Sequence, residues 1–135
     1  MQLMRSPGFD KRASGRTLLV IEDDADIRTL LKMQLGNAGY DTAFAWDAVT
    51  ALTIARKEEP DLIMLDIGLP GGDGWVVMER LQTLAPFAMI PIIVVSAQPT
   101  VPHAERAKAA GAHAFIEKPF EIGTVVAAVR DALGD

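Results

Sequence analysis

The chain has 135 residues and a formal net charge of −5, half of its residues are apolar, and it contains no cysteine. This length and composition are typical of one globular domain, and they exclude a disulfide framework and a metal site with cysteine ligands. The acidic balance argues against nucleic acid as a direct partner.

Residues 1–16 show no hydrophobic periodicity and include Pro7, Gly8 and Gly15. We expect them to form a flexible tail ahead of a single domain that spans residues 17–135. The tail lacks the apolar stretch of a signal peptide, and no apolar run reaches the roughly 20 residues that span a bilayer. We therefore expect a cytoplasmic protein that does not contact the membrane.

Short apolar runs alternate with amphipathic stretches from Thr17 onward. The runs predict strands over residues 17–21, 41–45, 62–65, 92–95 and 113–116. Apolar residues at helical spacing follow each run, and Asp47 stands where a helix N-cap is expected. Because a strand–helix unit repeats five times, the pattern predicts an α/β fold with one parallel sheet and helices on both faces.

The side chains that could carry chemistry stand just beyond the first, third, fourth and fifth predicted strands. They are Glu22, Asp23, Asp24, Asp66, Ser96 and Lys118. Sites in open parallel sheets form outside the carboxyl ends of the strands. A group of carboxylates with only oxygen donors favours Mg²⁺ as the compensating cation. A serine and a lysine beside it suit the oxygens of a phosphoryl group, and a carboxylate can be the nucleophile that forms an aspartyl phosphate.

Four segments carry a family resemblance: LLVIEDDADIRTLL (18–31), DLIMLDIGLPGGDGW (61–75), IPIIVVSA (90–97) and AHAFIEKPF (112–120). In this order and at these spacings they resemble the receiver domain of response regulators in bacterial two-component signalling, chemotaxis regulators included. The resemblance spans residues 17–133. It implies a single doubly wound, flavodoxin-like sheet of five parallel strands in the order 2-1-3-4-5.

The resemblance implies roles for the acidic residues. Asp66 corresponds to the aspartate that accepts the phosphoryl group. Glu22 and Asp23 correspond to the acidic pair that holds Mg²⁺ together with Asp66, and the backbone carbonyl of Gly68 is implied as a further ligand. An alternative in which the pair is shifted to Asp23 and Asp24 stays open.

Ser96 and Lys118 correspond to the residues that contact the phosphoryl group, and the peptide bond after this lysine, to a proline, is expected to be cis. Ser96 is also implied as a switch residue together with Phe115, the aromatic three residues before the lysine. Gly68 and Gln98 occupy positions that in this family are associated with the lifetime of the phosphoryl group.

The implied function is that of a phosphoacceptor signalling domain rather than an enzyme acting on a separate substrate. The donor would be a sensor histidine kinase or a phosphotransfer protein, and the target a downstream protein or an output domain. The face of the fourth helix, fifth strand and fifth helix is the implied output surface and a candidate homodimer interface. Two alternatives are a pseudo-receiver that acts only as a binding module, and a magnesium phosphohydrolase of the haloacid-dehalogenase type, which would need a second acid at Gly68.

Four aromatic side chains receive no functional role from the sequence. His103 and His113 stand without a partner motif, so we do not expect them to be ligands. Trp46 and Trp75 stand at predicted helix starts, and we expect packing or surface positions for both.

Overall fold

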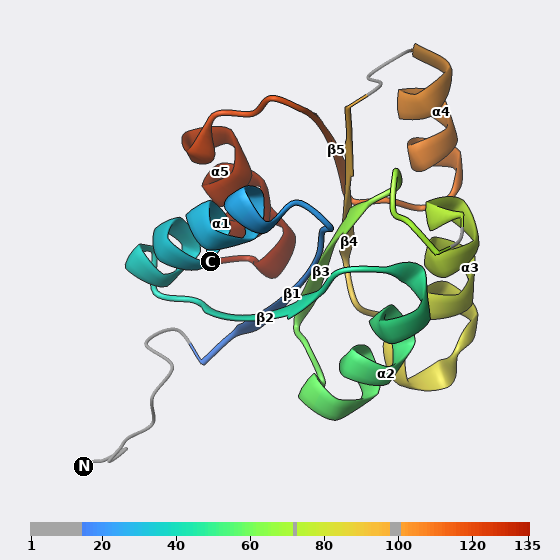
Figure 1. Ribbon diagram of the computed structural model, residues 1–135, viewed down its shortest axis with the longest axis horizontal. Coiled ribbons are helices and arrows are strands. Elements are labelled where there is room, and N and C mark those ends of the chain that lie inside the picture. Colours follow the sequence, from blue (N-terminus) through green and yellow to red (C-terminus); the bar gives the residue numbers. More distant parts are fainter. Residues whose placement is uncertain (1–14, 72, 98–100) are drawn as a thin grey trace.

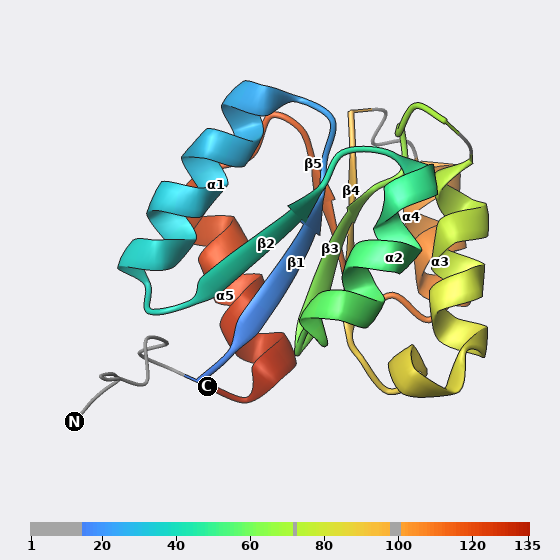
Figure 2. The same cartoon turned by 60° about the horizontal axis from the view of Figure 1, so that its bottom comes forward.

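The computed structural model describes residues 15–71, 73–97 and 101–135, and Figures 1 and 2 show it as a ribbon. The described strands are β1 (Thr17–Ile21), β2 (Asp41–Ala45), β3 (Leu62–Asp66), β4 (Ile92–Ser96) and β5 (Ala114–Glu117). The described helices are α1 (Ala25–Asn37), α2 (Ala48–Glu58), α3 (Gly74–Thr83), α4 (Val101–Ala109) and α5 (Ile122–Leu133), together with a short 3-10 helix, η1 (Ala85–Phe87).

The strands form one sheet in the order β2-β1-β3-β4-β5, and every neighbouring pair is parallel. Helices α1 and α5 cover one face of this sheet, and α2, α3 and α4 cover the other (Figures 1 and 2). The predicted doubly wound α/β fold and its strand order 2-1-3-4-5 are thereby confirmed. None of the helices in the described ranges has the length and apolar character needed to cross a membrane.

The core consists of two layers, one on each side of the sheet. Alternate residues of β1 face opposite layers: Leu18 and Val20 pack toward α1 and α5, whereas Leu19 and Ile21 pack toward α2 and α3. All four are at most 1% exposed. Burial on both faces explains why the central strands are continuous apolar runs without polar alternation. Each such side chain contributes about 1.5–3 kcal/mol of hydrophobic free energy.

Aspartates cap the starts of α1 and α2 next to the carboxyl edge of the sheet. Asp47 caps α2 through the backbone N–H of Thr50, as predicted. The Asp24 carboxylate accepts hydrogen bonds from Asp26 N–H and Ile27 N–H at the start of α1. Side-chain caps of this kind contribute to the stability of a helix, and here the cap occupies the carboxylate of Asp24.

Two strands extend one residue further than the apolar runs. The backbone of Asp66 pairs in register with Val95, and that of Ser96 with Glu117. Ile67 N–H then donates to Val95 O, and Lys118 N–H donates to Ser96 O, so the ladder continues past both polar residues. β5 is correspondingly shifted by one residue to Ala114–Glu117. As a result, Asp66 and Ser96 are held by the sheet itself rather than by a loop.

The predicted tail, residues 1–16, falls mostly outside the described residues. Its last residue, Arg16, is described, and its guanidinium donates to Leu133 O at 3.1 Å and contacts the Asp135 carboxylate at 3.0 Å. Tyr40 O–H donates to the same Asp135 carboxylate at 3.0 Å. These contacts fasten the end of α5 beside the start of β1, at the edge of the sheet opposite the clustered acids.

Candidate functional site

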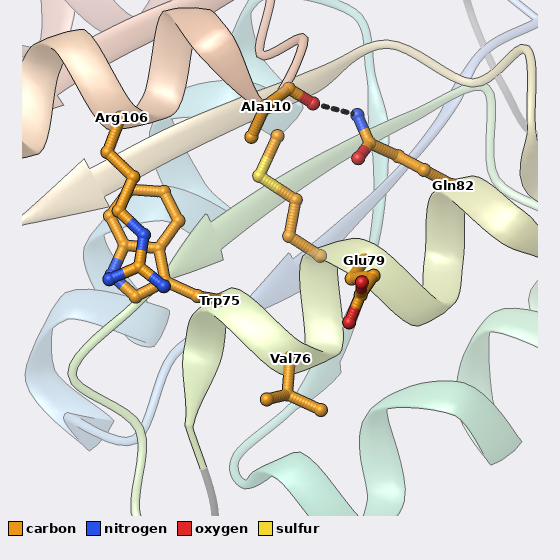
Figure 3. Close-up of a pocket in the computed structure, with 7 residues that line it drawn as sticks. Trp75, Val76, Glu79, Gln82, Arg106 and Ala110 are labelled. Carbon is orange, nitrogen blue, oxygen red and sulfur yellow. Dashed lines mark hydrogen bonds between the residues drawn. The ribbon is translucent and has the colours of Figure 1, made fainter.

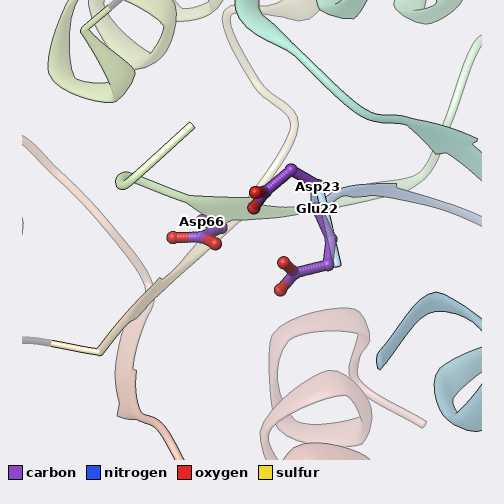
Figure 4. A group of neighbouring side chains, drawn as sticks. All are labelled: Glu22, Asp23 and Asp66. Carbon is purple, nitrogen blue, oxygen red and sulfur yellow. The ribbon is translucent and has the colours of Figure 1, made fainter. Parts of the chain in front are cut away.

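Three carboxylates meet at the carboxyl edge of the sheet. Glu22 and Asp23 follow β1, and Asp66 ends β3, the central strand. One carboxylate oxygen from each residue lies within 4.8 Å of the others. Figure 4 shows the three side chains. Glu22 and Asp66 are buried, with 3% and 6% exposure, while Asp23 is exposed. Because like charges at this distance repel, such a cluster is stable only with a compensating cation or proton.

Lys118 supplies part of that compensation. Its Nζ lies 2.7 Å from Glu22 Oε1 and 2.9 Å from Asp66 Oδ2. The lysine follows β5, and the bond between Lys118 and Pro119 is cis, as predicted. One ammonium against three carboxylates leaves the cluster negative, and this excess suits a divalent cation with oxygen ligands.

The charges in this cluster affect one another's ionisation. Burial raises the pKa of Glu22 above its usual value, although hydrogen bonds from Lys118 and from the backbone N–H of Asp24 act in the opposite direction. Burial by itself would lower the pKa of Lys118, but its hydrogen bonds to Glu22 and Asp66 outweigh burial and raise that pKa. Lys118 therefore carries its positive charge at neutral pH.

Hydrogen bonds orient the carboxylate of Asp66. The backbone N–H of Gly68 donates to Oδ1 at 2.8 Å, and Lys118 binds Oδ2. Glu22 is held in a similar way, since Asp24 N–H donates to its Oε2 and Arg28 donates to its backbone carbonyl. Both buried acids are thus held in place by groups on the neighbouring loops and on α1.

Asp23 and Asp66 of this cluster line an open cleft of about 430 Å³. Its lining residues come from the ends of β1, β3, β4 and β5 and from the first turns of α3 and α4. They are Asp23, Asp24, Asp66, Ile67, Gly68, Trp75, Ser96, Ala97, His103 and Lys118. The predicted candidates Asp66, Ser96 and Lys118 therefore line one cavity, and Ser96 is only 4% exposed.

Another predicted candidate lies away from the cleft. Phe115 in β5 is paired with Val94 and is partly buried against the core layer of α2, α3 and α4. It is not among the residues that line the cleft. Gln98 lies outside the described residues. Asp24 lines the cleft, but its carboxylate caps α1, which favours Glu22 and Asp23 as the metal-binding pair.

Sequence reasoning missed the contribution of Trp75 and His103 to this cleft. For Trp75, the feature of the sequence that indicates its position is the preceding residue, Gly74. A Cβ at Gly74 would lie 2.4 Å from the Cα of Ile67. Only glycine therefore lets α3 begin directly against the loop that follows Asp66, and this approach brings Trp75 to the mouth of the cleft. His103 lies in α4, the helix that follows Ser96, and it lines the cleft because of where α4 packs.

Residues 18–130 match the family model described as the response regulator receiver domain. The chain belongs to this family. The fold, the acidic cluster and the lysine described above are therefore those of a receiver domain, a signalling module found in two-component systems, and the cluster of Glu22, Asp23 and Asp66 is consistent with the metal site of such a domain.

The relatives of this receiver domain include longer regulators. It is 35% identical over 116 residues to the DNA-binding dual master transcriptional regulator RpaA of Synechocystis sp., covering 86% of this chain and 48% of RpaA. It is 32% identical over 122 residues to the DNA-binding transcriptional regulator NtrC of Rhizobium meliloti, covering 90% of this chain and 25% of NtrC. The chain thus spans half or less of the length of these two regulators.

Solved receiver structures align over nearly the whole domain. The chemotaxis response regulator CheY4 of Vibrio cholerae superposes with a TM-score of 0.81 at 25% identity, covering 87% of this chain and 98% of that chain. The receiver domain of the Francisella response regulator 1452 superposes with a TM-score of 0.82 at 25% identity, covering 89% and 98%.

Proposed function

We propose that this receiver domain accepts a phosphoryl group on Asp66 from the phosphohistidine of a sensor histidine kinase or a phosphotransfer protein. The observation that carries the proposal is the position of the Asp66 carboxylate and the hydrogen bonds that orient it. It lies at the floor of an open cleft and is oriented by Gly68 N–H on one oxygen and by Lys118 on the other. A buried, oriented carboxylate that a donor can still reach is suited to act as a nucleophile.

The donor set at this edge fits Mg²⁺. Three carboxylates within 4.8 Å of one another face a single ammonium, and all the available ligand atoms are oxygens. In this proposal Glu22, Asp23 and Asp66 hold the ion together with the backbone carbonyl of Gly68. When bound, it supplies positive charge beside the transferring phosphoryl oxygens.

The chain's own residues perform the transfer. An oxygen of the Asp66 carboxylate attacks phosphorus while the bond from phosphorus to the donor's imidazole nitrogen breaks, and the imidazole leaves. The Lys118 ammonium, already 2.9 Å from Asp66 Oδ2, pairs with one phosphoryl oxygen. The Ser96 hydroxyl, at the end of β4, donates to another. The product is an aspartyl phosphate.

The phosphoryl group then biases the output face. In this proposal Ser96 moves toward the phosphoryl group, Phe115 follows, and the surface of α4, β5 and α5 changes. The target is a downstream protein, or an output domain of the kind that the longer regulators carry, and this face is also the candidate homodimer interface. The proposal includes a cytoplasmic location, where kinases have access to ATP, and no direct contact with nucleic acid.

The two alternatives have less support. A pseudo-receiver would lack part of the phosphorylation machinery, whereas here Asp23, Asp66, Ser96 and Lys118 line one cleft. A phosphohydrolase of the haloacid-dehalogenase type needs a second acid two residues after the nucleophile, and that position is Gly68, which has no side chain.

Intact mass after incubation with acetyl phosphate and Mg²⁺ tests the proposal. We expect a gain of one labile phosphoryl group, absent when EDTA replaces Mg²⁺ and absent in Asp66→Asn. Undiminished uptake in Asp66→Asn would contradict the assignment of Asp66. No uptake by the wild-type chain from either acetyl phosphate or phosphoramidate would favour the pseudo-receiver.

A further inference from the structure

Two aromatic side chains line the cleft without a part in the proposed transfer. Trp75 comes from the first turn of α3 and His103 from α4, and both border the same cavity as Asp66 and Ser96. Their ring centres lie 6.1 Å apart with an angle of 64° between the ring planes. This edge-to-face geometry is a favourable arrangement of aromatic rings, so the two side chains join α3 and α4 across one side of the cleft.

The Trp75 indole is fixed by contacts on several sides. The backbone N–H of Trp75 donates a hydrogen bond to the Asp73 carboxylate at 2.8 Å. Gly74 lets the start of α3 lie directly against Ile67. The Arg106 guanidinium lies 4.5 Å from the centre of the indole ring, on the groove between α3 and α4 that Figure 3 shows. Since Arg106 lies one turn beyond His103, two successive turns of α4 hold the same indole.

Among the described residues that line the cleft, Gly68 provides no comparable barrier. Gly68 is exposed and offers only backbone, and a Cβ there would meet nothing closer than Asp66 Oδ1 at 3.4 Å. A larger side chain would fit at this position, but the sequence does not provide one. In the described part of the chain, an approach to Asp66 past Gly68 therefore meets only backbone, whereas the side of α3 and α4 carries the rings of Trp75 and His103.

We propose that Trp75 and His103 form a wall that limits the access of water to the phosphoryl group on Asp66 and so lengthens the lifetime of the aspartyl phosphate. The inference rests on the proposed function. In the reaction that the wall slows, a water oxygen adds to phosphorus and the bond from phosphorus to the Asp66 carboxylate oxygen breaks. The products are the free Asp66 carboxylate, inorganic phosphate and a proton released to solvent. Trp75 and His103 are positioning residues here, because they act by excluding water.

The test compares two substitutions at His103. The chain is phosphorylated, the donor is removed, and the loss of the phosphoryl group is followed by intact mass. We expect His103→Ala to increase the decay constant about fivefold, which corresponds to a barrier lower by about 1 kcal/mol. His103→Phe keeps an aromatic ring against Trp75 and has no titratable group, so its decay constant should stay close to that of the wild type.

His113→Ala is the matched control. His113 is exposed and lies 2.8 Å from the Asp131 carboxylate of α5, away from the cleft, so its removal should leave the decay constant unchanged. Equal decay constants in His103→Ala and the wild type would contradict the proposal that Trp75 and His103 limit the access of water. Slower decay in both His103 variants would also overturn it, because that result indicates that the imidazole promotes hydrolysis.

A second measurement needs no phosphorylation. In a Trp46→Phe background Trp75 is the remaining tryptophan, and acrylamide quenching of its fluorescence reports its exposure. We expect stronger quenching in His103→Ala but not in His103→Phe or His113→Ala, and equal quenching in all would contradict the contact. A wild-type chain that takes up no phosphoryl group would overturn the proposed function and the role of the wall with it. Normal phosphoryl uptake with equal decay rates in His103→Ala and the wild type would contradict only the proposed role of Trp75 and His103.

Discussion

At the scale of single residues, Lys118 supplies positive charge to the acidic cluster in the folded chain. It contacts two buried carboxylates at 2.7 and 2.9 Å, and its own side chain is only 14% exposed. Removing one partner of such a buried ion pair leaves charges that neither water nor a counter-ion compensates. The residue proposed to stabilise the phosphoryl group therefore also stabilises the fold.

We predict that Lys118→Met lowers the free energy of unfolding at neutral pH by about 3 kcal/mol, as measured by urea denaturation without Mg²⁺. The loss should shrink toward pH 4, since burial already raises the pKa of Glu22 and protonation relieves its repulsion with Asp66. Lys108→Met, on the exposed side of α4, serves as the control and should change stability by less than about 0.5 kcal/mol. A variant as stable as the wild type would contradict this account of the cluster.

Tyr40 gives a pH-dependent prediction away from the site. Burial, with the hydrogen bond to Asp135, raises its pKa above the ordinary value of 10.0. The folded chain therefore favours the neutral phenol, and this stabilisation is complete below pH 10 and is lost as the pH rises through the folded pKa. We expect Tyr40→Phe to be less stable than the wild type by about 1 kcal/mol at pH 8. The difference should decrease above pH 10, and a constant difference across this range would count against the hydrogen bond.

At the scale of elements, the start of α3 is the most constrained junction of the site. The backbone of Gly74 approaches Ile67 so closely that any side chain would overlap it. The same approach places Asp73 as the N-cap and sets Trp75 at the cleft. The position of this helix is thus coupled to the loop that carries Gly68.

We predict that Gly74→Ala destabilises the domain by about 1–3 kcal/mol, because the added methyl group forces α3 away from the loop. Gly123→Ala is the matched control: it lies in α5, and a Cβ there meets nothing within 4 Å. The control should raise stability by about 0.4–1 kcal/mol through the unfolded chain. Urea denaturation of the two variants checks both values, and equal effects would contradict the steric argument.

At the scale of the whole molecule, the fold followed from the sequence because its central strands are buried on both faces. The apolar runs at 17–21 and 92–95 are typical of parallel strands that are covered on both faces, and the helical stripes between the runs fit that arrangement. The alternation therefore predicted the layers, and the resemblance to receiver domains predicted the strand order. Several of the residues that line the cleft were predicted site residues, namely Asp23, Asp66, Gly68, Ser96 and Lys118, but Trp75 and His103 were not.

Other features could not be derived from the sequence pattern. Asp66 and Ser96 belong to β3 and β4, yet their polar side chains interrupt the apolar runs, so the pattern ends each strand one residue early. The contact between Trp75 and His103 joins two helices that are separate along the chain, and no local spacing reports it. Asp24 caps a helix, whereas its neighbour Asp23 joins the acidic cluster; the sequence shows only three adjacent acids.

The proposed metal site links this edge to the stability of the entire domain. A ligand that binds only the folded chain stabilises it, by about 2.7 kcal/mol at a concentration 100 times its Kd. We expect Mg²⁺ to raise the melting temperature of the wild type and to do so less in Asp23→Asn, which removes one exposed carboxylate of the cluster. An identical shift in both proteins would exclude Asp23 from the site.

The central claim is that Asp66 itself carries the phosphoryl group. Borohydride reduces an aspartyl phosphate to homoserine, so reduction of the phosphorylated chain followed by peptide mass spectrometry identifies the modified residue. The account predicts homoserine at position 66 alone, dependent on Mg²⁺ during phosphorylation. Homoserine at Asp23 or Asp24, or a phosphoryl group on a residue that borohydride does not reduce, would contradict it.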